Sequence, residues 1–314
     1  MAFAPDLTVI IPGRNEQFMR HTVEDVLAHS GPTTEVCAVC DGYWPSPGLE
    51  DHPRLQLIHF GEPVGQRAAT NAGAKLSRAK YIMKLDAHCA TDEGFDVKMM
   101  EKMQPDWTMV PMMHRLHVFD WACECGERVY QGAKPKRCEE CGETEFFMHM
   151  VWEPRTQYDP TVSWRFDKTL HFQYWRKHQK RNRVRRWAKK YGVIETMSCI
   201  GCAFLMERER FWELGGMDEG HGSWGQYGTE LACKAWLSGG KMVTCMDTWI
   251  AHLFRTGNFA KNNNSSWPYP ISQKQIDAAR KYSREMWLND KWPQAVRPLS
   301  WLIEHFAPIP GWHD

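Results

Sequence analysis

The most informative stretch of the chain is Tyr81-Ile-Met-Lys-Leu-Asp-Ala-His-Cys89. Its first five residues are typical of a short buried strand, and Asp86 and His88 follow where that strand ends. Residues two apart on an extended chain point to the same side, so this carboxylate and this imidazole face one direction. A later histidine, His252, completes a set of three side chains suited to a divalent cation, which in turn suits diphosphate oxygens.

The N-terminal third of the chain has the pattern of a parallel sheet. Leu7-Thr-Val-Ile-Ile11 is a β-branched, apolar run that ends at Pro12 and Gly13, and Glu35–Asp41 repeats the pattern. Helical stretches at 17–29 and 67–77 alternate with these runs, which predicts βαβ units. Ligands of such sheets bind beyond the carboxyl ends of the strands. The residues expected at that edge are Pro12, Glu16, Asp41, Asp86 and His88.

Composition limits the class of protein. The chain has 314 residues, 43% of them hydrophobic, and a net charge of only +1, so the molecule as a whole is no polycation. No apolar run approaches the ~20 residues that a membrane-spanning helix needs. Residues 1–6 lack the basic and apolar regions of a signal peptide. We therefore expect a soluble, cytoplasmic enzyme, in the host cytoplasm if the chain is viral.

Several motifs together carry a family resemblance. Thr8-Val-Ile-Ile-Pro-Gly-Arg-Asn-Glu16 resembles the opening of family 2-type glycosyltransferases, and Leu85–Cys89 is similar to the metal motif of polypeptide N-acetylgalactosaminyltransferases. The similarity resumes at Thr196-Met197, continues through Phe211–Asp218 and Trp224-Gly225, and returns at His252–Arg255. It covers roughly residues 5–115 and 195–290. It implies an α/β, GT-A fold, which is Rossmann-like with a mostly parallel sheet, and a UDP-sugar donor.

The resemblance also implies roles for individual residues. Asp86, His88 and His252 are expected to hold Mn²⁺ or Mg²⁺. Glu230 is predicted to be a base near the acceptor hydroxyl, although a structural role at a helix start is the alternative. Tyr227 stands where the family has a glutamate, which leaves retaining or inverting stereochemistry open. The remaining expected contacts are Pro12, Arg14, Glu16, Asp41, Arg67 and Asp86 for the nucleotide donor, and Asp218 and Arg255 for catalysis.

Between the two similar regions lies a cysteine-rich insertion. The sequence contains Cys123-Glu-Cys-Gly126 and Cys138-Glu-Glu-Cys-Gly142, with twelve residues between Cys125 and Cys138, which predicts two knuckles of a small zinc ribbon. Four thiolates, Cys123, Cys125, Cys138 and Cys141, form a closed tetrahedral set that suits a structural zinc ion. The first knuckle is one residue shorter than the usual Cys-x-x-Cys.

A strongly basic segment follows the insertion. Residues Arg176–Lys190 contain nine Lys or Arg in fifteen positions, interleaved with aromatic residues. This density predicts a surface for an anionic partner, although a solvated helix face is the common alternative. Nucleic acid is the partner that fits aromatic and basic residues together, and an anionic membrane is the second option.

The motifs divide the chain into five parts. These are residues 1–115 (nucleotide-sugar half), 116–150 (zinc ribbon), 151–194 (basic arm), 195–260 (acceptor half) and 261–314 (lid loop with a helical C-terminal segment). The polar run Phe259–Tyr269 is expected to close over the diphosphate.

The sequence therefore predicts a metal-dependent glycosyltransferase with an inserted zinc ribbon. The acceptor that combines a nucleic acid with a reactive hydroxyl is DNA carrying a hydroxymethylated pyrimidine, as in some bacteriophages, with the base flipped out or single-stranded. Two alternatives stay open. One is a glycosyltransferase acting on protein or polysaccharide, and the other is an inactive GT-A-like nucleic-acid-binding module.

Overall fold

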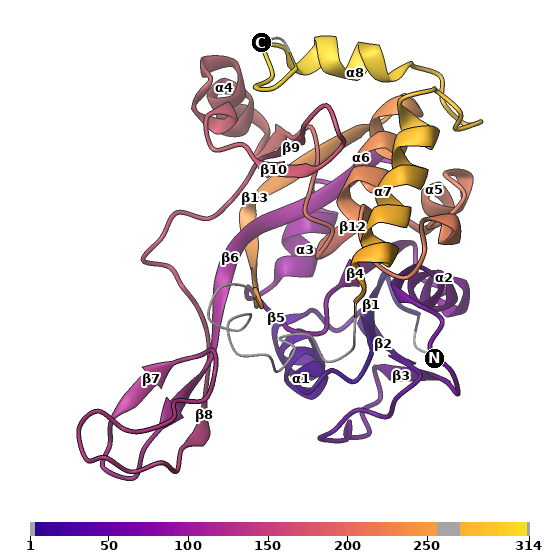
Figure 1. The fold of residues 1–314 in the computed structure, drawn as a ribbon. Helices are drawn as coiled ribbons and strands as arrows, with labels where there is room; N and C mark the ends of the chain where they lie inside the picture. The colour runs from indigo at the N-terminus through magenta and orange to yellow at the C-terminus, as the bar shows by residue number, and fades with distance from the viewer. Residues whose placement is uncertain (1–3, 256–270, 313–314) are drawn as a thin grey trace.

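The centre of the molecule is one long mixed sheet in the order β11-β13-β6-β12-β4-β1-β2-β3 (Figure 1). The structure is a computed structural model that describes residues 4–255 and 271–312. The strands are β1 (Leu7–Gly13), β2 (Thr34–Asp41), β3 (Leu55–Phe60), β4 (Tyr81–Leu85), β5 (Cys89–Thr91), β6 (Trp107–Ala122), β7 (Arg128–Tyr130), β8 (Phe147–Pro154), β9 (Trp164–Phe166), β10 (Phe172–Tyr174), β11 (Val193–Glu195), β12 (Ala203–Glu207) and β13 (Lys241–His252).

Helices cover both faces of this sheet. The α-helices are α1 (Met19–His29), α2 (Gln66–Leu76), α3 (Phe95–Met100), α4 (Asn182–Tyr191), α5 (Arg208–Glu213), α6 (Tyr227–Leu237), α7 (Gln273–Trp287) and α8 (Leu299–Phe306), with 3₁₀ turns η1 (His178–Lys180) and η2 (Glu219–His221). The helices predicted at 17–29 and 67–77 are confirmed as α1 and α2. All residues of α6 are buried, so this helix forms part of the core.

The N-terminal half of the sheet is parallel, as the βαβ pattern predicts. β1 pairs in parallel with β2 and β4, and β2 pairs in parallel with β3. Every residue of β1 is buried, which is typical of a central strand covered on both faces. Helix α2 lies so close to β1 that a side chain at Gly73 would not fit: a Cβ atom there would stand 2.5 Å from Cγ2 of Ile10. The predicted α/β fold class is confirmed. Strand β12 pairs antiparallel with β4, and from there on the sheet is mixed.

Strand β6 connects the sheet to the cysteine-rich insertion. Its first half pairs with β13, and its second half pairs with β7 and β8. The β7–β8 segment, at the lower left of Figure 1, therefore projects from the body on a continuous strand. It has a small hydrophobic cluster of its own around Cys123, Cys138 and Phe146. The insertion thus has its own small cluster and is joined to the body through β6.

Residues 164–191 differ from the separate basic arm that the sequence suggested. Trp164, Phe166 and Trp175 lie in the main hydrophobic core, and β9 pairs with β10 as a small second sheet. Arg181 donates hydrogen bonds from Nη1 to the Phe306 carbonyl (3.1 Å) and from Nη2 to the Pro308 carbonyl (2.6 Å). The segment is consequently anchored on the body and on the helical C-terminal part. Within the described residues, no helix has the length and apolarity needed to cross a membrane.

Candidate active site

A pocket of about 530 Å³ opens at the carboxyl ends of β1, β2 and β4. This is the edge that the strand pattern predicted for ligands. The N-terminal half contributes charged side chains, and segments 199–202 and 223–229 contribute the opposite wall. The lining residues that matter below are Pro12, Arg14, Glu16, Asp41, Gln66, Asp86, His88, Phe172, Tyr174, Gln226, Tyr227, His252, Phe254, Arg255 and Arg280.

The three residues predicted as metal ligands meet at one wall of this pocket. Asp86 and His88 follow β4, and His252 ends β13, which pairs with β5 so that His252 lies opposite Cys89. Nε2 of His252 is 3.2 Å from Nε2 of His88 and 3.2 Å from Oδ2 of Asp86. One ligand atom from each residue lies within 4.8 Å of the others. Side chains 166 positions apart in the chain are therefore gathered into one ligand set.

The hydrogen bonding of these residues fits a cation. Nδ1 of His88 lies 3.0 Å from Glu16 Oε2, which places a proton on Nδ1 and leaves the Nε2 lone pair facing the cluster. Nδ1 of His252 is buried and has no hydrogen-bond partner among residues 4–255 and 271–312. A proton on Nε2 of His252 can be donated to Nε2 of His88 or to Oδ2 of Asp86, but not to both. A cation between the three side chains would interact with all of them. The donor set of one carboxylate and two imidazoles is suited to a divalent transition-metal ion.

Local electrostatics keep the cluster in the protonation state that a metal requires. Burial lowers the pKa of His252 to about 4, although Asp86 acts in the opposite direction, so the imidazole is neutral near pH 7. Burial alone would raise the pKa of Asp86, but the nearby Lys84 ammonium and His252 hold it well below its usual range. A neutral imidazole and an ionised carboxylate are both ready to bind a cation without releasing a proton.

Glu16 and Arg255 form a buried ion pair beside this cluster. Nη2 of Arg255 donates to Oε1 and Oε2 of Glu16 at 2.6 and 2.7 Å. Burial would raise the pKa of Glu16, but His88 and Arg255 lower it to about 2. Both residues line the pocket, so the structure places the predicted nucleotide contact Glu16 and the predicted catalytic residue Arg255 next to the metal cluster. Glu16 orients His88 and Arg255 at once.

Arg14 and Asp41 form a second pair at the floor of the pocket. Nε and Nη2 of Arg14 lie 2.9 and 2.6 Å from Oδ2 of Asp41. Asp41 also accepts hydrogen bonds from the backbone amides of Val64 and Gly65, at 2.5 and 3.2 Å to Oδ1. Arg14 and Asp41, together with Pro12, line the pocket beside the start of α2. Their predicted role in binding the nucleotide is compatible with this position.

Arg67, Asp218 and Glu230 occupy positions that do not favour their predicted roles. None of them lines the pocket. Nε of Arg67 donates to Oε2 of Glu230 at 2.7 Å, and both side chains are almost fully buried. Glu230 also accepts bonds from the backbone amide of Asp218 and from Lys234. A base must contact the acceptor hydroxyl, so this position favours the structural alternative for Glu230. Arg67 is buried as the partner of Glu230, which does not favour its predicted contact with the donor.

The structure adds two residues that the sequence did not single out. Nε2 of Gln66 donates to Oδ1 of Asp86 at 2.9 Å, at the first residue of α2. Lys84 is fully buried, and its ammonium bonds both Asp86 and the Gly201 carbonyl (2.9 Å). A lysine inside an apolar strand was the available signal, because a buried lysine needs an anionic partner. The predicted lid, Phe259–Tyr269, lies outside the described residues.

The four ribbon cysteines come together at the end of the β6 stem. Sγ of Cys123 is 3.5 Å from Sγ of Cys141, and Sγ of Cys125 is 3.6 Å from Sγ of Cys138. All four sulfur atoms lie within 4.8 Å of one another. Both knuckles bend back on themselves, with Gly126 N donating to Cys123 O and Gly142 N donating to Cys138 O. This arrangement fits one tetrahedral ion.

The basic segment forms an exposed face on η1 and α4. Arg181 is half-buried and bonded to the C-terminal part, as described above. The other basic side chains are exposed, and none forms an ion pair with a carboxylate in residues 4–255 or 271–312. We call them the α4 basic face: Arg176, Lys177, Lys180, Arg183, Arg185, Arg186, Lys189 and Lys190.

Comparisons with known proteins agree with this geometry. Residues 8–121 match the family described as Glycosyl transferase family 2. "Putative polypeptide N-acetylgalactosaminyltransferase 13" of Drosophila melanogaster is 24% identical over 245 residues, which cover 75% of this chain and 36% of that protein. "Polypeptide N-acetylgalactosaminyltransferase 10" of Homo sapiens is 24% identical over 266 residues, which cover 80% of this chain and 38% of that protein. The chain thus spans little more than a third of the length of these relatives.

The fold is similar to a solved structure, GalNAc-T7 with UDP, GalNAc and Mn²⁺. The TM-score is 0.66 at 17% sequence identity, and the match covers 96% of this chain and 57% of the other. This likeness establishes the GT-A fold that the resemblance implied. Together with the family match and the relatives, it supports the predicted enzyme class, a glycosyltransferase.

Proposed function

We propose that this chain is a metal-dependent glycosyltransferase that moves a sugar from a UDP-sugar to a hydroxyl acceptor. The observation that carries the proposal is the convergence of Asp86, His88 and His252 at the pocket wall, beside the Glu16–Arg255 pair. Asp86, His88 and His252 would hold the divalent ion, which supplies positive charge to the donor diphosphate when bound. The presence of UDP and Mn²⁺ in the similar solved structure supports this reading.

Two arginines of the pocket, Arg255 and Arg14, would supply further positive charge to the donor. Arg255 faces the same wall as the metal cluster and is held there by two bonds to Glu16. A guanidinium fixed in place stabilises a departing diphosphate without reorganising during the reaction. Arg14, held by Asp41, supplies a second cation where the nucleotide is expected. The pocket is large enough for a nucleotide sugar's reactive half, since small-molecule sites have volumes of roughly 300–1,000 Å³.

For the acceptor, we propose a hydroxymethylated pyrimidine in DNA. The α4 basic face supports an anionic polymer, because like charges at this density repel one another unless a polyanion covers them. A flipped or unpaired base would carry the reacting hydroxyl into the pocket. A protein or polysaccharide acceptor is the alternative, and it leaves the basic face without a partner.

We also propose that Cys123, Cys125, Cys138 and Cys141 hold one structural zinc ion. A set of four thiolates leaves no open position, so this ion would brace the module and take no part in the transfer. It would be chemically distinct from the ion at Asp86, His88 and His252, which includes an oxygen ligand and imidazoles.

The test uses the purified chain with Mn²⁺ and a panel of UDP-sugars. Release of UDP, measured with and without a chelator, establishes donor use; acceptor transfer is followed by mass spectrometry of nucleosides from hydroxymethylated and unmodified DNA. We expect metal-dependent UDP release, and a hexose mass added only to the hydroxymethylated nucleoside. UDP release that a chelator leaves unchanged would exclude the metal-dependent reaction, and transfer to protein or glycan alone would exclude the DNA acceptor.

A further inference from the structure

Two exposed tyrosines and an arginine form a preformed stack where the ribbon leaves the body. The Arg155 guanidinium lies 4.9 Å from the ring centre of Tyr130 and 4.8 Å from that of Tyr158. Its Nη1 and Nη2 donate to the two phenol oxygens, at 3.3 and 3.2 Å. Tyr130 is 43% exposed and Tyr158 56% exposed. We call these three residues the stem stack.

The stem stack is held in place by the strand that carries the ribbon. The Arg155 backbone amide donates to the carbonyl of Arg115 on β6 at 2.8 Å. Nε2 of Gln131, a buried residue, donates to the Tyr130 oxygen (3.0 Å) and to the Leu116 carbonyl (3.1 Å). Rings fixed in this way lose little freedom when a ligand stacks on them, which favours binding.

A continuous series of contacts leads from the stem stack to the pocket. Arg115 is exposed, and its guanidinium lies 5.5 Å from the ring centre of Phe254, which lines the pocket. The Phe254 ring in turn meets the His252 ring at 4.5 Å. Tyr130 pairs with Asp120, five residues beyond Arg115 on β6, a span of about 17 Å at the rise of an extended strand. This length corresponds to a few nucleotides of an extended chain.

Aromatic residues also line the pocket at β10. Phe172 and Tyr174, both on β10, line the pocket and meet edge to face with ring centres 5.1 Å apart. Burial raises the pKa of Tyr174, while the positive charges of Arg115 and Arg176 act against this shift. Arg176 is the first residue of the α4 basic face. The rim therefore links that face to Arg115 and the stem stack.

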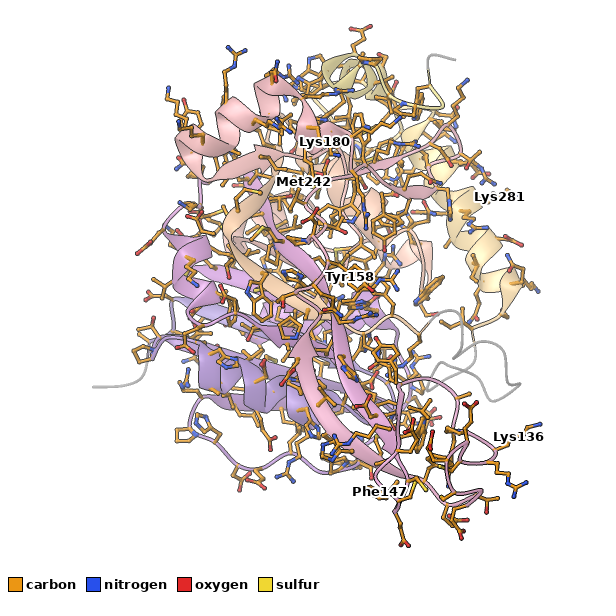
Figure 2. The ribbon with its side chains drawn as sticks, turned by 90° about the vertical axis from the view of Figure 1, so that its left-hand side faces the viewer. Lys136, Phe147, Tyr158, Lys180, Met242 and Lys281 are labelled. Atoms are coloured by element: carbon orange, nitrogen blue, oxygen red, sulfur yellow. The ribbon has the colours of Figure 1, made fainter. Side chains whose placement is uncertain are left out.

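The cations along this path are not used for internal ion pairs. In residues 4–255 and 271–312, neither Arg115, Arg155 nor Arg176 has a carboxylate partner. Apart from Tyr130, the ribbon tip (residues 123–146) differs, since it holds six Glu against four Lys or Arg. Figure 2, turned to the side that carries the ribbon, shows Lys180 above Tyr158, with Lys136 and Phe147 of the ribbon below. The basic and aromatic residues thus lie between the α4 basic face and the ribbon, and the ribbon tip is not part of that path.

We propose that the stem stack, Arg115 and the Tyr174 rim form a track for a single-stranded nucleic acid that presents one base to the pocket. The proposal rests on the proposed function and names the form of its acceptor. Partly exposed tyrosines next to guanidinium groups without a carboxylate partner among the described residues match unpaired bases joined by phosphates. Base faces in a duplex are covered by their neighbours, and a neutral polysaccharide would leave the arginines uncompensated.

Binding of a fluorescein-labelled 20-nucleotide single strand, measured by anisotropy, tests the track. We expect Tyr130→Ala/Tyr158→Ala to bind at least tenfold more weakly than the parent, because stacking contributes roughly 1–3 kcal/mol per base. Tyr158→Phe, which keeps the ring, should bind within about threefold of the parent. Phe147→Ala is the matched control, since Phe147 is 54% exposed on the ribbon but lies outside the track. A duplex of the same sequence should bind at least tenfold more weakly than the single strand.

Two outcomes overturn the proposal. One is equal binding by the parent and the double tyrosine variant, and the other is a parent that binds the duplex as tightly as the single strand. UDP release from the donor alone is measured on the same samples, and it should be unchanged in every variant because the stem stack does not touch the pocket. A parent that releases UDP but does not bind the single strand refutes the track alone, whereas absent UDP release in the parent refutes the proposed function.

Discussion

Arg67 and Glu230, separated by 163 positions in the chain, form a fully buried ion pair 2.7 Å long behind the pocket wall. The pair ties α2 to the first turn of α6, and Arg67 also donates to the carbonyls of Gly222 and Gly225 (3.1 and 2.8 Å). Those glycines flank Trp224, which lines the pocket. The pair therefore shapes the pocket without entering it.

Glu230→Gln tests this structural role. We expect the free energy of unfolding in urea to fall by about 3–5 kcal/mol, because removing one partner leaves the Arg67 charge buried and uncompensated. Glu213→Gln is the control, since Glu213 is 64% exposed in its pair with Arg210 and should change stability by less than about 0.5 kcal/mol. Unchanged stability together with a hundredfold loss of transfer would instead establish Glu230 as the base first predicted.

Removing a ligand of the metal cluster should abolish metal-dependent donor use. We expect Asp86→Asn and His252→Ala to reduce UDP release by roughly 100-fold or more, because a cation contributes several kcal/mol to a charged transition state. Mn²⁺ binding, followed by the electron paramagnetic resonance of the free ion, should fall in parallel. His52→Ala, at an exposed histidine outside the pocket, is the control. Wild-type Mn²⁺ binding in either ligand variant would contradict the assignment.

The ribbon should contain one zinc ion per chain. Elemental analysis of the purified protein should give a ratio near one, and Cys141→Ser should lower it because a tetrahedral thiolate set is then incomplete. Cys233→Ala, in the core helix α6, should retain the zinc. Limited proteolysis should cut residues 123–146 of the Cys141 variant first. A zinc-free parent with an intact ribbon would count against the site.

Binding of nucleic acid to the α4 basic face should depend steeply on salt. We expect Arg185→Ala/Arg186→Ala to make the slope of log K against log salt shallower by about 1.5, because each phosphate contact contributes roughly −0.7 to −0.9. Arg181 is left in place, since its bonds to Phe306 and Pro308 support the fold. Lys75→Ala/Arg78→Ala removes the same exposed charge from the α2 end and should leave the slope unchanged. Equal slopes in the two double variants would exclude this face.

The buried His178 should make the fold sensitive to mild acid. Burial lowers its pKa to about 4, the Glu195 carbonyl opposes this shift, and the charges of Arg181 and Arg183 add to it. Between about pH 6.5 and 4 the unfolded chain binds a proton that native His178 does not, so stability falls with falling pH, by at most about 3 kcal/mol. His178→Phe should flatten this dependence in urea unfolding at pH 7.5 and pH 5. An identical pH dependence of stability in parent and variant would contradict this role of His178.

Much of the donor half was predictable because its signals are local. A strand such as Leu7–Ile11 is recognisable from a few residues, and strand ends in a parallel sheet meet at one edge, so Glu16, Asp41 and Asp86 could be grouped from sequence alone. The cysteine spacing likewise predicted a four-sulfur cluster, which the structure brings together. Their roles as ligands and contacts remain predictions for the experiments above.

The residues that sequence reasoning misplaced are charged groups whose partners are distant in the chain. The family resemblance predicts a base at Glu230 because it matches an acidic position of that family, and no residue near it in the sequence indicates a pairing with Arg67. Whether a carboxylate serves as a base or as a buried pair depends on desolvation and on which cation lies within bonding distance. Arg181 is a similar case, because its acceptors at Phe306 and Pro308 belong to the far end of the chain.

Local patterns are enough to predict the buried strands of this protein, the helices between them, the metal-ligand motif, the cysteine knuckles and the density of positive charge. Which of these features act together depends on how the chain packs. This packing sets His252 against Asp86 and His88, Arg67 against Glu230, and the stem stack at the base of the ribbon. The physical reason is that local patterns record the burial and backbone preference of each segment, whereas a pair of side chains depends on distances of a few ångströms that the packing of remote segments sets.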